Sequence, residues 1–407
     1  MNVAEIRKLF PILTSEVYGR PLVYLDNAAT SQRPQQVLDK MIEMAGKNNA
    51  NIHRAVHKLS GDATGEYESA RDCVKNFLNA EHREEIIFTS GTTASINLVA
   101  TCFGEVFIKK GDEILIAGCE HHSDIVPWQM LALRKGAVIK VLPVDENGRL
   151  EVDLLPELLT EKTKIACVAQ VANVLGVKNP VNEIVNICHS RGCAVLIDGA
   201  QGVVHEGMDV RRSDCDFYVF SGHKVYASTG VGVLYGKKEL LEKMPPYMGG
   251  GEMIGSVSFE KTTYAPLPMK FEAGTQNFNS VPTLIPALEL AAAFLLDEDV
   301  VKAQNSIVEY MLGELKQISG LRLYGDTLPK ERIPLFSFSI EGIHHEDLAL
   351  ILDKMGFAVR SGQMCAEPLM DRYGVSGMLR ASFAPYNTIE EARSFVGALH
   401  KAIEMLK

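Results

Sequence analysis

The sequence contains no long apolar run, no excess of basic residues and no paired cysteines. Its net charge of −10 argues against a general nucleic-acid binder, which would present a basic face. Even the apolar stretch 287–296 contains Glu289 and is far shorter than a membrane span. The amino terminus, MNVAEIRKLF, lacks the basic and then apolar pattern of a secretory leader. The eight cysteines are scattered without a CxxC spacing, so we expect free thiols in a cytoplasmic protein.

Two phosphate-binding motifs, GxGxxG and GxxxxGK followed by Ser or Thr, are also missing. The chain therefore has no readable dinucleotide or ATP site. Strand-like and helix-like patterns alternate from about residue 23 to residue 235, which is typical of a mostly parallel sheet with helices on both faces. We predict an α/β fold with a large domain over residues 23–290. Residues 1–22 and 291–407 are expected to form a smaller α+β domain.

Two apolar, strand-like runs, 194–198 and 216–220, are each followed by polar residues. The first ends in Asp198, and the second leads into Lys224. Ligands of open α/β sheets bind at the carboxyl ends of the strands, so both side chains are expected to face one pocket. An acid beside a ring nitrogen and a Schiff-base lysine are what pyridoxal phosphate (PLP) needs from a protein. For either residue alone, a turn cap at Asp198 or a solvated Lys224 is the better explanation. The two residues together, each after a buried-looking strand, favour PLP.

Two loops that follow predicted strands add polar groups to this picture. The turn 90–93, Ser-Gly-Thr-Thr, opens a helix and is either a phosphate cup or an ordinary N-cap. His121 and His122 follow the strand 113–118, but HExxH and a cysteine pair are both missing. An imidazole stacked on a flat cofactor therefore fits better than a metal site. His53 and His57 are four residues apart without a third ligand nearby, so no metal is predicted there either.

Cys365 differs from the other cysteines in its surroundings. It lies in a loop, AVRSGQMCAEPLM, five residues after Arg360, whose charge would favour a thiolate. The other cysteines, such as Cys167, lie in apolar runs. Cys365 is thus either a nucleophile or an incidental loop cysteine. Arg380, on a predicted strand, suits either a substrate carboxylate or a structural salt bridge.

The chain resembles the cysteine desulfurases of the SufS type, which are class V PLP enzymes. The stretches that carry the resemblance occur in order over nearly the whole chain: YLDNAAT, NIHRAVH, SGTTASINLVA, EHHSDIVPWQM, VANVLGVKNP, DGAQ, DCDFYVFSGHKVY, FEAGT, RSGQMCA and LRASFAPYN. The short interval between Arg360 and Cys365 also resembles this branch, group II, because the other branch has a longer cysteine loop. The resemblance implies the type I fold of PLP-dependent transferases.

The resemblance also implies a role for each of a larger set of residues. Those expected to bind the cofactor are Lys224 as Schiff-base lysine, Asp198 at the pyridine nitrogen, Gln201 at the phenolic oxygen, His121 on the ring, and Thr92, Thr93, Ser221 and His223 at the phosphate. Thr275 would reach the phosphate bound by the neighbouring subunit, which implies a homodimer. Those expected at the substrate are Asn173 and Arg380 at its carboxylate, and His53 and Arg360 along the pocket.

The implied reaction converts L-cysteine to L-alanine, with Lys224 as the base and Cys365 as the sulfur acceptor. The resulting persulfide would serve iron–sulfur cluster assembly through a SufE-like or SufU-like partner, and selenocysteine is a plausible second substrate. Many relatives carry two histidines just before the cysteine, where this chain has Gln363 and Met364. The alternatives are a kynureninase-like hydrolase or an epimerase, which need no loop cysteine. A non-catalytic sulfur-assembly scaffold is a further alternative, but it would not need Lys224 and Asp198.

Overall fold

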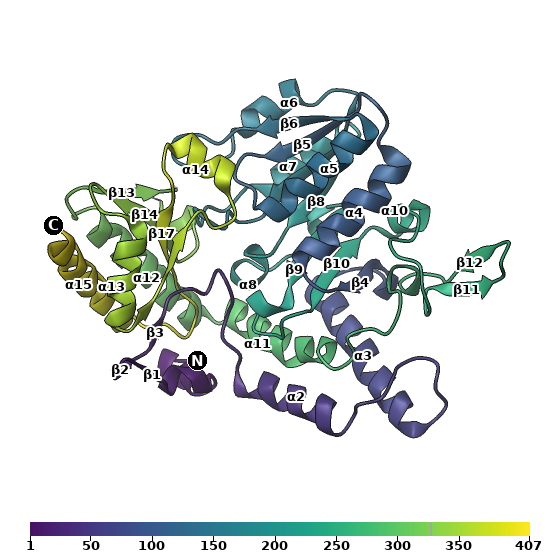
Figure 1. The fold of residues 1–407 in the computed structure, drawn as a ribbon, viewed down its shortest axis with the longest axis horizontal. Helices are drawn as coiled ribbons and strands as arrows, with labels where there is room; N and C mark the ends of the chain where they lie inside the picture. The colour runs from purple at the N-terminus through teal and green to yellow at the C-terminus, as the bar shows by residue number, and fades with distance from the viewer. Residues whose placement is uncertain (326–327) are drawn as a thin grey trace.

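A seven-stranded sheet forms the centre of the computed structural model, which describes residues 1–325 and 328–407 (Figure 1). Its strands, in spatial order, are β4 (Ile86–Thr89), β10 (Gly232–Gly236), β9 (Phe217–Ser221), β8 (Ala194–Asp198), β7 (Thr163–Ala169), β5 (Glu113–Ala117) and β6 (Val138–Leu142). The five strands from β9 to β6 pair in parallel, whereas β10 is antiparallel to both of its neighbours. The predicted mostly parallel sheet is therefore confirmed.

Helices cover both faces of this sheet. One face packs against α3 (Lys58–Phe77), α7 (Val181–His189) and α11 (Leu284–Leu296), and the other packs against α4 (Thr92–Phe107) and α5 (Val126–Lys135). The strands supply apolar side chains to both cores in alternation, because successive residues of a strand point to opposite faces. Ile114 and Ile116 of β5 contact the second core, for example, and Leu115 contacts the first. Such strands read as continuous apolar runs, which is why they were predictable.

A second, antiparallel sheet carries the carboxyl-terminal part of the chain. Its strands, in order, are β13 (Leu321–Tyr324), β14 (Leu335–Ile340), β17 (Met378–Ser382) and β16 (Arg360–Gly362). The helices in its own apolar core are α12 (Glu298–Leu315), α13 (His345–Lys354) and α15 (Ile389–Leu406). Nearby, β15 (Phe357–Ala358) pairs in parallel with β3 (Val23–Tyr24), and Leu25 belongs to this core. The domain boundaries given above stay a prediction.

The remaining elements are short. The helices are α1 (Val3–Lys8), α2 (Gln35–Gly46), α6 (Leu155–Leu158), α8 (Gly202–His205), α9 (Val210–Ser213), α10 (Lys238–Lys243) and α14 (Glu367–Tyr373), and the strands are β1 (Glu16–Val17), β2 (Arg20–Pro21), β11 (Ile254–Val257) and β12 (Thr262–Tyr264). Within residues 1–325 and 328–407, none of the helices is long and apolar enough to cross a membrane.

Three stretches have a sequence pattern that predicts something other than the structure. The pattern of residues 283–319 predicts one helical stretch, but the structure has two helices there, because Asp297 has an extended conformation and its carboxylate caps α12. The Gly- and Pro-rich residues 245–275 predict a loop, but they contain the hairpin β11–β12. The apolar pattern predicts a helix from Ala63, but α3 begins at Lys58, where the imidazole of His57 accepts the N–H of Ser60 as an N-cap. Polar residues with capping roles and short polar strands give no apolar periodicity, so these boundaries were not visible in the sequence.

A buried ion pair joins α3 to the loop that follows β12. Arg71 of α3 is fully buried and donates to Glu272 through both terminal nitrogens, at 2.7 and 2.9 Å. Glu272 also accepts the N–H of Phe88 at 2.8 Å and the hydroxyl of Tyr67 at 3.0 Å. Four donors on one buried carboxylate offset the free energy that its removal from water costs.

We predict that Glu272→Gln lowers the free energy of unfolding by about 3 kcal/mol, because the fully buried Arg71 then keeps only the partly exposed Glu68 carboxylate as a counter-charge. Denaturant titration followed by circular dichroism measures this loss. Asp62→Asn is the control, since it breaks the exposed Lys58–Asp62 pair at 2.8 Å and should cost less than about 0.5 kcal/mol. Equal losses in the two variants would contradict the prediction.

Candidate active site

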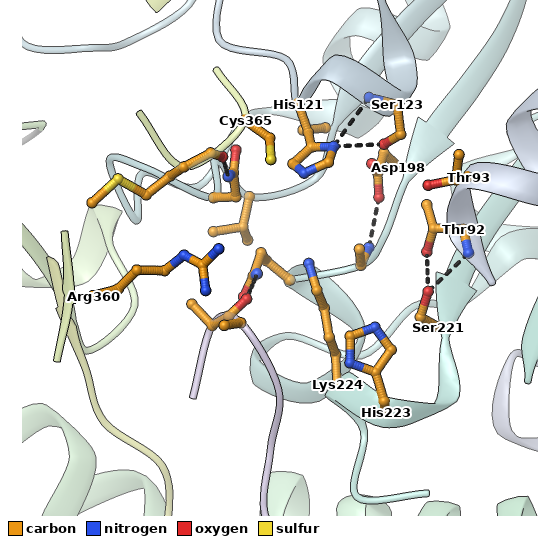
Figure 2. Close-up of a pocket in the computed structure, with 18 of the residues that line it drawn as sticks. Thr92, Thr93, His121, Ser123, Asp198, Ser221, His223, Lys224, Arg360 and Cys365 are labelled. Atoms are coloured by element: carbon orange, nitrogen blue, oxygen red, sulfur yellow. Dashed lines mark hydrogen bonds between the residues drawn. The ribbon is translucent and has the colours of Figure 1, made fainter. Parts of the chain in front are cut away.

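A cavity of about 240 Å³ lies at the carboxyl ends of the parallel strands. The predicted site residues that line it are Thr92, Thr93, His121, Asn173, Asp198, Gln201, Ser221, His223, Lys224, Arg360, Cys365 and Arg380. Figure 2 shows them arriving from both sheets, with Cys365 and Arg360 on the side of the second sheet. The topology explains this meeting, because parallel strands end at one edge of their sheet.

Asp198 and Lys224 bring opposite charges into this buried edge. Asp198 ends β8, is 5% exposed, and accepts the N–H of Ala200 at 2.8 Å. Burial raises the pKa of the Asp198 carboxyl, and the Lys224 ammonium partly offsets that effect. Burial also lowers the pKa of Lys224 to about 8, against an ordinary value of 10.5, although Asp198 acts in the opposite direction. A lysine with such a pKa is partly a free amine near neutral pH and can act as a nucleophile or base.

The amino-terminal end of α4 forms the opposite end of the cavity. The Thr92 N–H donates to Ser221 Oγ at 2.8 Å, and the two hydroxyls lie 2.8 Å apart. Thr93 and His223 complete this end of the lining. Burial lowers the pKa of His223 to about 4, so its ring is neutral. Backbone N–H groups at the start of a 16-residue helix, together with hydroxyls, are suited to bind a phosphate.

His121 is held in one orientation and one protonation state. Its Nδ1 accepts the N–H of Ser123 at 3.1 Å, so the hydrogen of the neutral ring is assigned to Nε2. Burial, and then the charge of Lys224, lower the pKa of His121 to about 4. A fixed, neutral imidazole at the cavity wall is suited to stack on a flat ring. The residues described by the structure contain no cluster of three or more possible metal ligands.

The backbone of the loop that carries Cys365 is hydrogen-bonded to residues that follow strands of the first sheet. The N–H of His122 donates to the Cys365 carbonyl at 2.7 Å, and Asn173 Nδ2 donates to the Met364 carbonyl at 2.9 Å. His122 Nε2 also accepts the N–H of Glu367 at 2.9 Å. Met364 and Cys365 both have positive φ, at 49° and 55°, a region that residues other than glycine rarely occupy. Such strain is characteristic of functional loops.

Among the described cysteines, Cys365 is the exposed one, whereas Cys73 is half-buried and the others are buried. This agrees with the expectation that Cys365 differs from the other cysteines, such as Cys167, in its surroundings. Burial raises the pKa of Cys73 to about 11, which leaves that thiol protonated at neutral pH. An accessible loop sulfur in the cavity lining is thus a specific property of Cys365.

Arg380 forms a structural ion pair and still has a donor directed to no acceptor of the described residues. It is 2% exposed, donates to the Asn173 carbonyl at 2.9 Å and contacts Asp26 Oδ1 at 3.3 Å, so a structural ion pair is present. Its Nε has no acceptor among the described residues, and its side chain lines the cavity. Burial lowers the pKa of Arg380 to about 10, so it stays charged near neutral pH. The guanidinium therefore has a donor left for a bound carboxylate.

Two predicted site residues, His53 and Thr275, lie outside the cavity of this chain. His53 Nε2 instead contacts Glu68 Oε1 at 3.2 Å on α3, and Thr275 is exposed on another part of the surface. The loop that carries His53 ends five residues later at the start of α3, which holds it away from the strand ends. His53 therefore does not line the cavity of its own chain, and its expected place along a substrate pocket stays a prediction.

The family model described as Aminotransferase class-V matches residues 23–395. The chain belongs to this family. The predicted type I fold of PLP-dependent transferases is confirmed by the likeness to the crystal structure of the Escherichia coli cysteine desulfurase CsdA, which is 40% identical, with a TM-score of 0.92 and complete coverage of both chains. A second likeness, to the apo structure of a cysteine desulfurase from Thermococcus onnurineus, has a TM-score of 0.93 at 35% identity and covers 99% of this chain and 98% of the other.

Curated relatives of this class-V chain have full-length similarity. The cysteine desulfurase of Pectobacterium atrosepticum is 45% identical over 405 residues, which is 99% of this chain and 98% of that protein. The probable cysteine desulfurase of Vibrio cholerae is 43% identical over 407 residues, which is the whole of both chains. The chain is thus an enzyme of a PLP-dependent family.

The cavity residues fit PLP by the chemistry of their donors. A buried carboxyl, a lysine of lowered pKa and a neutral imidazole surround one part of the cavity, and N–H and hydroxyl groups surround the end at α4. These match the pyridine ring, the aldehyde carbon and the phosphate of the cofactor.

Sequence reasoning missed Asp26, Ser123 and the His122 contacts to the cysteine loop. Their positions in YLDNAAT and EHHSDIVPWQM were the available signal.

We predict that covalent attachment of PLP to the apoprotein becomes faster as pH rises through about 8, because only the unprotonated Lys224 amine attacks the aldehyde. Burial lowers this pKa, so the amine fraction grows about two pH units earlier than for a free lysine. Stopped-flow absorbance of the bound cofactor gives the initial rates, and Lys224→Ala shows any background. A midpoint near 10 would contradict the prediction.

Proposed function

We propose that the chain is a cysteine desulfurase of the SufS type, which converts L-cysteine to L-alanine and holds the sulfur as a persulfide on Cys365. The observation that carries the proposal is the exposed Cys365 sulfur in the lining of the cavity that also contains Asp198 and Lys224. Three residues that are far apart in the sequence and carry complementary chemistry meet there. The names of relatives more than 40% identical over the full chain support the same activity.

In this proposal the cavity residues first position the substrate. The Arg380 guanidinium and the Asn173 amide hold its carboxylate, and both side chains are buried, so water competes little for them. Bound PLP supplies the electron sink that stabilises negative charge at Cα. Lys224, with a pKa of about 8, takes the Cα proton because its unprotonated form is populated near neutral pH. Asp198 keeps a negative charge behind the ring nitrogen.

Cys365 then acts on the substrate sulfur. Its thiolate forms the S–S bond while the substrate Cβ–S bond breaks, and the electron pair stays on the carbon fragment. Protonation of that fragment yields alanine, so one cysteine and one thiol give one alanine and one persulfide. The loop that carries Cys365 is anchored through the backbone of residues 364 and 365, which leaves the sulfur free to react.

The competing functions do not use this arrangement. A kynureninase-like hydrolase or an epimerase would leave the exposed Cys365 without a role, and a non-catalytic scaffold would not need the Asp198–Lys224 pair. Selenocysteine is proposed as a second substrate, because the same residues would act on a better leaving atom. We further propose that the persulfide passes to a SufE-like or SufU-like acceptor for iron–sulfur cluster assembly in the cytoplasm, where the free thiols remain reduced.

The proposed assembly is a homodimer in which His53 and Thr275 serve the cavity of the partner subunit. Both residues lie outside their own cavity, and both are tied to α3. Glu68 of α3 contacts His53 and the Arg71 Nε, while Arg71 binds Glu272, three residues before Thr275. One buried network therefore fixes the two segments that would complete the neighbouring site.

We predict that Cys365→Ala abolishes persulfide formation and sulfide release from L-cysteine, while the protein keeps the visible absorbance of bound PLP. The reason is that Lys224 and Asp198 are untouched and the sulfur acceptor is missing. Alanine and sulfide assays, with mass spectrometry for the persulfide, measure the effect. Cys73→Ala is the matched control and should keep the native rate. Sulfur transfer at the native rate by the Cys365 variant would refute the assignment.

Mixed dimers test whether Thr275 acts across the subunits. Lys224→Ala and Thr275→Ala homodimers should each be nearly inactive at limiting PLP. A randomised equal mixture should recover roughly a quarter of the wild-type activity, because half of the dimers carry one intact site of two. If Thr275 served its own chain, the mixture would contain no intact site and would stay inactive.

A further inference from the structure

Two buried acidic residues lie behind the cavity and have no role in the proposed reaction. Glu120 follows β5, and Asp124 lies in the short helical turn His122–Asp124. They are 2% and 0% exposed. Neither lines the cavity, so the substrate does not contact them.

Each of these carboxyl groups has one oxygen with a donor and one without. The Ala169 N–H donates to Glu120 Oε1 at 2.6 Å, and the Trp128 indole N–H donates to Asp124 Oδ1 at 2.7 Å. Glu120 Oε2 and Asp124 Oδ2 are buried and have no donor among the described residues. The two residues are four positions apart around the turn that contains His122–Asp124, and a hydrogen bond between their side chains contributes to the pKa of each.

Two ionised carboxylates cannot hydrogen-bond, because both are only acceptors. A proton between them satisfies both free oxygens and removes one of two buried charges. We propose that Glu120 and Asp124 hold one proton between their facing oxygens and act together as positioning residues for Asp198. This inference concerns the fixed charge of the site and does not depend on which reaction the site performs.

The surroundings of the pair favour the shared proton. Burial, and then the Asp124 charge, raise the pKa of Glu120, and burial followed by the Asp198 charge raises that of Asp124. The other titratable groups that interact with the pair or with Asp198 are Cys119, Cys167, Tyr218 and Lys224. Burial raises the pKa of both thiols and of the Tyr218 phenol, so these three groups are neutral and Lys224 is the one cation of the set.

The pair also has a mechanical link to Asp198. Glu120 holds the N–H of Ala169, and Ala169 is the register partner of Asp198 in the β7–β8 ladder. The pair therefore anchors the strand end beside Asp198 and places one net negative charge behind it. A second negative charge at this depth favours protonation of any nitrogen that Asp198 contacts.

Infrared difference spectroscopy of the holoenzyme tests the proton directly. The wild type should show the carbonyl stretch of a buried, protonated carboxylic acid, and both Asp124→Asn and Glu120→Gln should lose it. Glu85→Gln is the matched control and should keep the band, because the buried Glu85 side chain accepts the N–H groups of Glu81 and His82 and belongs to another part of the molecule. A wild type without the band, or a band that survives both substitutions, would overturn the proposal.

Thermal unfolding as a function of pH gives a second readout. An acid whose folded pKa is raised holds its proton in the folded state, so the wild type loses stability as pH rises from about 5 toward that pKa. Asp124→Asn replaces the proton with an amide donor to Glu120, and its melting temperature relative to the wild type should therefore increase with pH. If Asp124→Asn does not fold, Glu120→Gln is compared with the wild type in the same way. A difference independent of pH would contradict the shared proton.

The cofactor absorbance reports the charge behind Asp198. Each single amide variant keeps one negative charge, so the pH midpoint of the visible absorbance change should stay at its wild-type value. The double variant Glu120→Gln with Asp124→Asn removes that charge and should lower the midpoint, because the protonated form of the bound chromophore loses stabilisation. An unchanged midpoint in the double variant would show that the pair does not act on the site.

Discussion

The buried Lys224 amine facing the buried Asp198 carboxyl is the interaction on which the site depends. Each group alone would cost several kcal/mol as an ion in this environment, and each reduces that cost for the other. The compensation is partial, because the lysine pKa remains lowered to about 8. Parallel pairing of β8 with β9 holds the two strand ends next to each other. The fold thus supplies an amine that is chemically available, and not one that is locked in an ion pair.

The second sheet supplies Cys365, the residue that we propose accepts the sulfur. Cys365 follows β16 of the second sheet, yet its loop is bonded to His122 and Asn173, which follow β5 and β7 of the first. The same Asn173 that we propose binds substrate also donates to the loop, and Arg380 of the second sheet donates to the Asn173 carbonyl. Substrate binding and cysteine placement therefore share one set of hydrogen bonds. The positive φ values at Met364 and Cys365 show that these bonds hold a conformation the chain would otherwise avoid.

The sequence predicted well those features that depend on apolar pattern or on a resemblance between motifs. Strands β5, β7, β8 and β9 are buried on both faces and read as apolar runs. Asp198 ends β8, Lys224 follows β9, and Cys365 follows β16 of the second sheet. Features that depend on one polar contact were hidden. His57 caps a helix, Asp297 breaks another, and Asp26 joins two arginines only after the sheets meet. A buried acid such as Asp124 also looks like a surface residue until its burial is known.

This chain has Gln363 and Met364 where many relatives have two histidines just before the cysteine. We therefore expect the acid–base groups that serve the cysteine loop to lie on the first sheet. Met364 is buried, and its backbone carbonyl is what the loop uses. Neither residue can titrate, so the titratable groups near Cys365 are those that line the same cavity, and the exposed thiol also exchanges protons with solvent. Lys224 is such a group, since the Cys365 charge already acts on its amine, and His121 has a hydrogen assigned to Nε2. In the proposed reaction, the base Lys224 and the sulfur acceptor Cys365 are therefore electrostatically coupled, although residues 363 and 364 cannot titrate.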